Sequence, residues 1–477
     1  MGATKGEGVL AEGLWGACGA AKGAARENPD CNPGSYMTAQ FLVLLLAGAL
    51  LAVLAPVARA QAPALPTIEG PVNGPGPMYP GLRPLTAGTA PEDYGYVTEE
   101  FFVSGTTRTG NPTVEQTYTT RILVRSPKKP QRFSGIVVAE VMHSNGFAVT
   151  FEPSRHSFLL RGHVHVEIAA QLGNVTGTVK PFNPERYGTL AIASGAQTSQ
   201  IVAQVGRLLK SNLLKPLPVR HVLLMGTSQS SGVLRTYQSQ QHFQARMPDG
   251  SPVFDGYLAV STLGGAPMMV VDVPTIMMPT QTEVNSGAAA GNTYRRPDSD
   301  EPGNRLRIYE TAGMPHANGR DTIAYTPGMC TQPVSDFPWG AAVSVGLHHL
   351  VQWVDAGITP PRAPYIEVDN DTANDGSRLA LDANGNVKGG VRNVYVDVPV
   401  AQFSVPNAGA TPAAQFLCSI AGVRTEFTEE KLSSLYRNRG DYLSDVVRRA
   451  VHLIREGWLL PENAPDVLVD ALEADIP

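Results

Sequence analysis

The stretch from His221 to Ser230 constrains the fold of this chain more than any other. Its residues 222–225 are uniformly apolar, which is typical of a central parallel strand that is buried on both faces. Gly226-Thr227-Ser228-Gln229-Ser230 follows without a spacer, and residues 231–244 then have the apolar spacing of a helix. We therefore expect a strand, a tight turn with serine at its centre, and a helix.

This order of elements is the context in which G-x-S-x-G presents a reactive serine. A tight turn lifts the hydroxyl of Ser228 out of the sheet, and the start of the helix offers unpaired N–H groups to a developing anion. Ser230 stands where the second glycine would be, but it is still small enough for the helix to pass close to the strand. The simpler interpretation is a serine-rich turn at an ordinary junction, so the rest of the chain has to decide.

Strand and helix patterns alternate on both sides of this turn. With 477 residues, 43% of them hydrophobic, the chain can bury one large core. Alternating strands and helices predict an α/β fold with a mostly parallel central sheet flanked by helices, in which ligands bind at the carboxyl ends of the strands. Strands are predicted at 96–104, 117–125, 135–143, 161–170, 222–225, 253–261, 274–280 and 305–311, and helices at 197–211, 231–244, 338–356, 428–437 and 441–456.

The first 60 residues have the pattern of a targeting segment. Phe41 to Leu54 is an apolar run of signal-peptide length, and Ala58-Arg59-Ala60 has the form of a cleavage site before Gln61. We expect an exported protein, periplasmic or secreted, that starts at Met1 or at Met37. The alternative is an uncleaved N-terminal anchor, because no Lys or Arg precedes the apolar run after Met37.

The remaining chain divides into three parts by composition. We expect residues 61–94, rich in proline and glycine, to run over the surface, residues 95–362 to form the catalytic domain, and residues 363–477 to form a helical C-terminal extension packed on it. A net charge of −5 gives no reason to expect nucleic acid or an anionic membrane as a partner. No segment after residue 60 has the length and apolarity of a membrane span. Nothing in the sequence indicates the oligomeric state.

Two cysteines remain beyond the targeting segment, Cys330 and Cys418. In an oxidising compartment they could form a disulfide that closes a loop over 88 residues, and such a bridge stabilises by about 4 kcal/mol in the chain-entropy model. Two unrelated buried thiols are the alternative, since spacing does not fix geometry.

An acid and a base follow the serine in the order Ser228, Glu283, His316. Glu283 comes just after the strand predicted at 274–280, and His316 just after the strand at 305–311. This is the order of α/β-hydrolases and not that of the chymotrypsin or subtilisin type. Glu283 could instead be a solvated turn residue, and a lone loop histidine is usually structural.

Other loops near the predicted site have weaker patterns. His143-Ser144-Asn145-Gly146 leaves a buried strand, and the backbone near Ser144 is our candidate for the second oxyanion donor, beside the N–H of Gln229. Residues 173–188 form a long segment of the kind that often covers a site, and 285–304 look like a polar excursion above it. His163 and His165 could share one face of a strand, where hydrogen-bonded sheet histidines are commoner than a metal site.

The chain resembles the α/β-hydrolases, and more closely a bacterial α/β-hydrolase-domain family whose nucleophile turn reads G-x-S-Q-S. The resemblance implies a nucleophile at Ser228, a base at His316 and an acid at Glu283. His143-Ser144-Asn145 replaces the Asn-x-Ser/Thr of relatives, so the identity of that oxyanion donor stays open. Besides the turn, the resemblance runs through 96–105, 161–162, 170–171, 184–188, 297–298, 310–316 and 389–392.

Together these features predict an exported serine hydrolase of the carboxylesterase type. Ser228 would attack the acyl carbon of a small-molecule or oligomeric ester, His316 would take its proton, and water would release the acyl-enzyme. No metal or organic cofactor is required. The alternatives are an amidase, peptidase or acyltransferase with the same three residues, or a hydrolase-like binding protein without turnover.

Overall fold

The computed structural model describes residues 61–477, apart from 111, 212–216, 263–265 and 370–377. These residues belong to one compact unit, Ala60–Pro477. The predicted signal peptide, with its apolar run at 41–54 and the cleavage site after Ala60, lies outside the described residues. Within the described ranges, no helix is both long enough and apolar enough to cross a bilayer.

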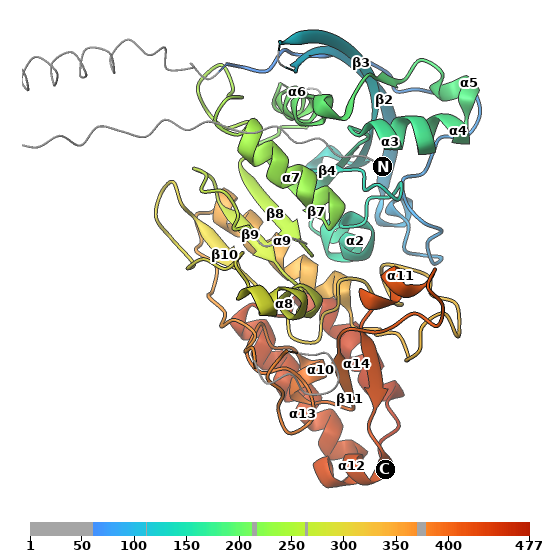
Figure 1. Cartoon of the computed structure of the whole chain (residues 1–477), viewed down its shortest axis with the longest axis vertical. Helices are drawn as coiled ribbons and strands as arrows, with labels where there is room; N and C mark the ends of the chain where they lie inside the picture. The colour runs from blue at the N-terminus through green and yellow to red at the C-terminus, as the bar shows by residue number, and fades with distance from the viewer. Residues whose placement is uncertain (1–60, 111, 212–216, 263–265, 370–377) are drawn as a thin grey trace, which may run out of the picture. The chain divides into compact units, whose positions relative to one another are not determined.

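A mixed, mostly parallel sheet forms the centre of the unit (Figure 1). Its strands lie in the order β1-β2-β3-β5-β4-β7-β8-β9-β10, and β6 pairs with β3. The strands from β5 to β10 in this order run parallel, whereas β1, β2, β3 and β6 form an antiparallel edge. The bounds are β1 (Thr67–Glu69), β2 (Tyr96–Thr109), β3 (Val114–Pro127), β4 (Ile136–Val141), β5 (Val164–Ile168), β6 (Ala191–Ile192), β7 (His221–Thr227), β8 (Gly256–Val260), β9 (Thr275–Met278) and β10 (Leu306–Ile308).

Helices cover both faces of this sheet. α6 (Thr198–Lys210) and α7 (Gln229–Gln240) pack on one face, and α2 (Phe151–Leu160) and α9 (Trp339–Asp355) on the other. Side chains of β4 alternate between the two layers: Val137 and Ala139 join the core under α6, whereas Ile136 and Val138 join the core under α9. Both faces are buried, so the residues of β4 are apolar except Glu140, which is buried beside His165.

The C-terminal extension packs on the main domain through the core under α9. Ile366, Val391 and Phe403 belong to that core. The N–H of Val391 donates to the Glu310 carbonyl at 2.6 Å, and a Cβ at position 390 would lie 2.6 Å from the same oxygen, so only glycine fits there. The elements of the extension are α10 (Val394–Asp397), β11 (Ala401–Ser404), α11 (Gln415–Ser419), β12 (Val423–Glu426), α12 (Glu429–Leu435), α13 (Arg439–Glu456) and α14 (Ala464–Glu473).

Several elements differ from the prediction. α2 was not expected, because Pro153 and the buried polar residues Ser154 and Ser157 break its apolar stripe. α14 was also missed. Most of residues 61–94 are exposed or half-buried, but β1 pairs with β2 and Tyr79 is buried.

Candidate active site

Ser228 lies in the sharp turn between β7 and α7. Its backbone has φ 54° and ψ −119°, a strained conformation for a residue with a side chain. A Cβ at Gly226 would lie 2.7 Å from the backbone of Ser230, so the helix passes as close to the strand as the sequence suggested. The hydroxyl of Ser230 donates to the Thr227 carbonyl at 2.8 Å and accepts the Thr227 N–H at 2.9 Å, and it thereby closes the turn.

Hydrogen bonds connect Ser228, His316 and Glu283 in one line. His316, in the loop after β10, places its Nε2 2.9 Å from the Ser228 hydroxyl oxygen. Its Nδ1 lies 2.5 Å from Oε1 of Glu283. Glu283 belongs to the first turn of α8 (Gln281–Gly287), which follows β9 directly, and not to an open turn. The histidine and the carboxylate are both buried, whereas the serine is partly exposed.

The protonation states follow from these contacts. Burial alone would raise the pKa of Glu283, but the neighbouring His316 and hydrogen bonds from the N–H and hydroxyl of Thr280 hold it below its ordinary value. A charged carboxylate only accepts hydrogen bonds, so Nδ1 of His316 carries the proton that it shares with Glu283. In the neutral imidazole, Nε2 is then free to accept the proton of the serine hydroxyl.

The start of α8 holds the histidine loop as well as the carboxylate. The N–H of His316 donates to the Thr282 hydroxyl at 3.0 Å, and the N–H of Gly313 donates to the Gln281 side chain at 2.8 Å. Since acid and base are fixed to one helix end, their separation depends little on the rest of the chain.

The two residues predicted to donate to the oxyanion, Gln229 and Ser144, line the same cavity as Ser228. Gln229 is the first residue of α7, so its N–H has no acceptor within the helix. The N–H of Ser144 donates to the side-chain oxygen of Gln229 at 3.2 Å. Gln171 pairs with the same side chain through two amide hydrogen bonds of 2.6 and 3.2 Å. Gln171 was not among the predicted site residues, although the resemblance included the pair 170–171.

These groups share one cavity of about 1420 Å³, lined by Ser144, Ser228, Gln229 and His316 among others. Glu283 is not in its wall and lies behind the histidine. The expectation that residues 285–304 lie above the site is wrong, since none of them lines the cavity. Arg295 of that segment is half-buried and pairs with the buried carboxylate of Glu310 at 2.6 and 2.7 Å.

The segment 173–188 was expected to cover the site, but the structure does not place it over the cavity. It folds into the short helical elements α3 (Leu172–Asn174), η3 (Val175–Val179), α4 (Lys180–Phe182) and α5 (Pro184–Tyr187). Arg186 and Tyr187 bind the buried Glu100 at 2.7 and 2.8 Å, which fixes the segment to β2. Of this segment only Gly173 lines the cavity, next to Gln171 and Leu172.

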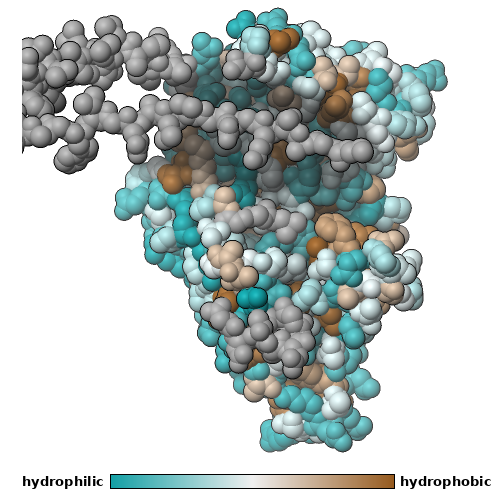
Figure 2. All heavy atoms as spheres, viewed as in Figure 1, coloured by the Kyte–Doolittle hydropathy of each residue, from teal (hydrophilic) through white to brown (hydrophobic). Residues whose placement is uncertain are grey.

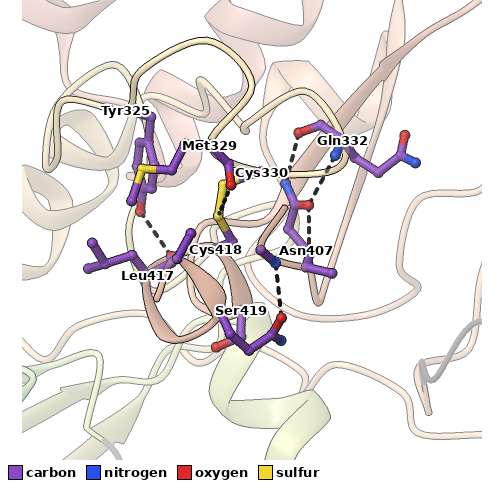
Figure 3. The surroundings of a disulfide bond; sticks show 12 residues. Tyr325, Met329, Cys330, Gln332, Asn407, Leu417, Cys418 and Ser419 are labelled. Carbon is purple, nitrogen blue, oxygen red and sulfur yellow. Dashed lines mark hydrogen bonds between the residues drawn. A yellow bond between two sulfur atoms is a disulfide. The ribbon is translucent and has the colours of Figure 1, made fainter. Parts of the chain in front are cut away.

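The C-terminal extension supplies a wall that the sequence did not reveal. Phe416 and Leu417 of α11, together with Ile420, line the cavity. A disulfide between Cys330 and Cys418 ties α11 to the loop that follows the histidine (Figure 3).

His163 and His165 have hydrogen-bond partners within the fold. Nδ1 of His163 lies 2.8 Å from the Ser134 hydroxyl, and His165 contacts Glu140 and Arg125. Within the part of the chain that the structure describes, no group of three or more His, Cys, Asp or Glu side chains is placed to hold a metal ion.

Comparisons with known proteins agree with this architecture. The sequence model of the alpha/beta hydrolase domain family matches residues 68–469. A search of curated proteins finds no match. Similar solved structures include an esterase from Rhizomucor miehei (10% identity, 60% of this chain and 99% of that one, TM-score 0.32) and a serine hydrolase without a lid from Xanthomonas campestris (12%, 43% and 84%, 0.27). A putative dienelactone hydrolase from Klebsiella pneumoniae is a third (12%, 44% and 85%, 0.26). These likenesses are distant, and the family match carries the assignment.

Proposed function

The chain belongs to the alpha/beta hydrolase domain family, and from this premise we propose that it is a serine hydrolase that cleaves a carboxylic ester through an acyl-enzyme. The observation that carries the proposal is the line of hydrogen bonds from Ser228 through His316 to Glu283, with the serine on a strained turn that faces a large cavity. A merely structural serine would need neither the strain nor the cavity.

Each group has a defined task in this mechanism. Nε2 of His316 takes the hydroxyl proton of Ser228 while the Oγ of Ser228 attacks the acyl carbon. Glu283 keeps the imidazole in the required tautomer and stabilises the imidazolium that forms. The same proton then passes to the leaving oxygen, the alcohol departs, and a water molecule activated by His316 hydrolyses the acyl-serine.

The anion that forms on the carbonyl oxygen requires donors that are already in place. The N–H groups of Gln229 and Ser144 are our candidates. Since the Ser144 N–H donates to the Gln229 side chain in this structure, the oxyanion would take over the place of that amide oxygen. Gln171 would retain the displaced side chain through their amide pair.

We also propose that the protein works in an oxidising compartment, periplasmic or secreted. The Cys330–Cys418 disulfide supports this, because such bonds persist outside the reducing cytosol. Intact-mass and N-terminal analysis of the cell fraction that contains the protein tests this proposal. A cytosolic protein with two free thiols would contradict it.

The test of the proposed activity is labelling of the full chain with a fluorophosphonate, read by intact mass. We expect one adduct on the wild type and none on Ser228→Ala, while Ser434→Ala, which removes an exposed hydroxyl from α12, labels like the wild type. Ester and amide substrates of equal size then separate an esterase from an amidase or peptidase, and an added acceptor alcohol reveals acyl transfer. No adduct on a folded wild type would point instead to a binding protein without turnover.

A further inference from the structure

The cavity beside Ser228 has two unlike arms. Resting on the proposed ester cleavage, we propose that the natural substrate joins an apolar leaving group, which packs on α11, to a neutral acyl group that carries hydrogen-bonding groups along its length and lies on α7. The two arms are argued separately below.

The apolar arm is formed by Phe416, Leu417 and Ile420, with Ile323 beside them. The side chain of Phe416 is 66% exposed, which is unusual for a large aromatic residue that has no ligand to cover it. Figure 2 shows hydrophobic surface at the place that α11 occupies in Figure 1. An aromatic or aliphatic group of the substrate would remove this surface from water.

This arm is fixed next to the candidate base. The N–H of Ala317, the residue after His316, donates to the carbonyl of Ile420 at 2.9 Å. The Cys330–Cys418 disulfide and a 3.3 Å hydrogen bond from the Tyr325 hydroxyl to the Leu417 carbonyl also hold α11 (Figure 3).

The position of His316 decides which part of the ester lies there. Its Nε2 must pass a proton to the leaving oxygen, so the leaving group has to lie on the histidine's side of Ser228. α11 flanks the histidine loop on that side. The apolar arm therefore belongs to the alcohol, and the acyl group extends the other way.

The polar arm follows one face of α7. The residues that line the cavity recur with helical spacing: Gln229, Gly232, Val233, Thr236, Ser239 and Gln240. Thr198, Ser199 and Gln200 at the start of α6 line it as well. An exposed helix face is normally rich in charged residues, but these lining side chains are amides and hydroxyls apart from Val233. Such groups both donate to and accept from neutral polar ligands.

Charge and length narrow the acyl group further. No carboxylate occurs among the described residues that line the cavity, and the one Arg in its wall, Arg108, has its Nε 3.4 Å from the carboxylate of Glu115. The cavity therefore has no carboxylate to bind a cation, and its one arginine is partly neutralised by Glu115 and would bind an anion weakly. Thr236, which also lines the cavity, lies eight residues after Ser228, or about 12 Å along the helix. An acyl group of about that length can reach its hydroxyl.

A panel of esters tests the two arms together. The probes are 2-phenylethyl and ethyl esters of lactobionic acid, of N-acetyl-triglycine and of decanoic acid. Lactobionic acid offers hydroxyl groups, the peptide offers amide groups, and decanoic acid offers neither. We expect kcat/KM to be about tenfold higher for 2-phenylethyl than for ethyl, and about tenfold higher for the better polar acyl group than for decanoyl. The polar acyl group with the higher kcat/KM shows whether the substrate's hydrogen-bonding groups are hydroxyls or amides.

Two variants assign the arms, each with a matched control. Phe416→Ser should abolish the preference for 2-phenylethyl, whereas Leu472→Ser, at an exposed leucine of α14, should keep it. Thr236→Val, which keeps the shape of the side chain and removes its hydroxyl, should lower the preference for the polar acyl groups about threefold. Ser434→Ala removes a hydroxyl that likewise donates to a carbonyl of the preceding helical turn, and it should change nothing. Ratios between substrates do not depend on the fraction of folded enzyme.

The outcomes separate this inference from the proposed function. If the fluorophosphonate labels Ser228 but decanoyl is preferred, or Phe416→Ser alters selection of the acyl group instead of the alcohol, the two-arm assignment is overturned while ester cleavage stands. Absence of both labelling and turnover overturns the proposed function itself.

Discussion

Two buried histidine–carboxylate pairs at the sheet behave in opposite ways. His316 and Glu283 lie 2.5 Å apart (Nδ1 to Oε1), and His165 and Glu140 lie 3.2 Å apart (Nε2 to Oε2). The first pair has one ring nitrogen at the cavity, next to a serine hydroxyl. The second is sealed within the fold, with both partners fully buried.

The sealed histidine has no nitrogen left for chemistry. Arg125 donates to its Nδ1 at 2.9 Å, so Nε2 carries the proton that faces Glu140. The Phe151 ring stacks on the imidazole with centroids 4.1 Å apart. Burial and the charge of Arg125 keep the pKa of His165 well below its ordinary value, and the ring stays neutral.

The carboxylates of the two pairs, Glu140 and Glu283, have pKa values shifted in opposite directions. Burial raises the pKa of Glu140 to about 8, against the hydrogen bonds from Thr150 and Phe151. Glu283 is also buried, but His316 and Thr280 outweigh burial and lower its pKa. Of the two pairs, only the one whose ring faces the cavity and whose carboxylate stays charged has the arrangement that a base requires.

The largest expected effect comes from replacing each of the two histidines by glutamine. His316→Gln should lower kcat/KM for 4-nitrophenyl acetate about 10⁵-fold, because the serine loses its base. His165→Gln should instead destabilise the fold by about 3 kcal/mol, since it leaves buried polar groups poorly paired. Urea unfolding and activity per folded molecule measure the two effects. An active His316→Gln would remove the distinction between the pairs.

The carboxylate at the cavity gives the next largest effect. Glu283→Gln should lower kcat by about 10³-fold to 10⁴-fold, because an amide can hold the imidazole in the wrong tautomer. Glutamine still caps α8 at this position, so at neutral pH the melting temperature should fall only by what the charged carboxylate contributes. A large loss of stability without a loss of turnover would assign Glu283 to structure alone.

The two carboxylates should also give opposite dependences of stability on pH. Glu140, with its pKa raised to about 8, contributes stability below its ordinary pKa that is lost as pH rises towards 8. Glu283, with its pKa lowered, contributes stability above its ordinary pKa that is lost as pH falls. Between pH 5 and 8, Glu140→Gln should remove a fall of about 3 kcal/mol in the free energy of unfolding.

Urea unfolding at both pH values measures this fall. Glu283→Gln serves as the comparison, because it should flatten the acid side only. An unchanged slope in Glu140→Gln would mean that Glu140 stays charged in the folded protein.

The smallest expected effect comes from the hydrogen bond that positions the backbone of His316. Thr282→Val removes the hydroxyl that accepts the N–H of His316. The loop should lose some of its alignment, and kcat should fall about fivefold with KM unchanged. Steady-state kinetics on one ester measures this, with Thr428→Val at the start of α12 as an exposed control.

The strand-to-helix turn and the parallel sheet could be predicted because they depend on local patterns. A uniformly apolar strand such as β7 and the small residues at 226 and 230 leave few alternatives to a tight turn. The order Ser228, Glu283, His316 predicted candidates that the fold brings together, although their roles remain a proposal.

Long-range features could not be predicted in this way. Phe416 has no distinguishing pattern in the sequence, and its place at the cavity depends on contacts between segments about 90 residues apart, which include the disulfide and the Tyr325–Leu417 hydrogen bond. The segment 173–188 looked like a cover, since its anchor, Glu100, lies on a distant strand. α2 was hidden because its buried serines and glutamate bind partners that periodicity does not reveal.

The bond between Cys330 and Cys418 has a practical consequence for work with this protein. A reducing bacterial cytosol would yield chains in which α11 lacks its covalent bond to the histidine loop, while the turn that carries Ser228 is complete. Under the proposed function, we expect such material to hydrolyse generic test esters and yet to rank substrates differently. Substrate screens should therefore start from protein made in an oxidising host, and the ranking obtained with and without reductant should be compared before any substrate is assigned.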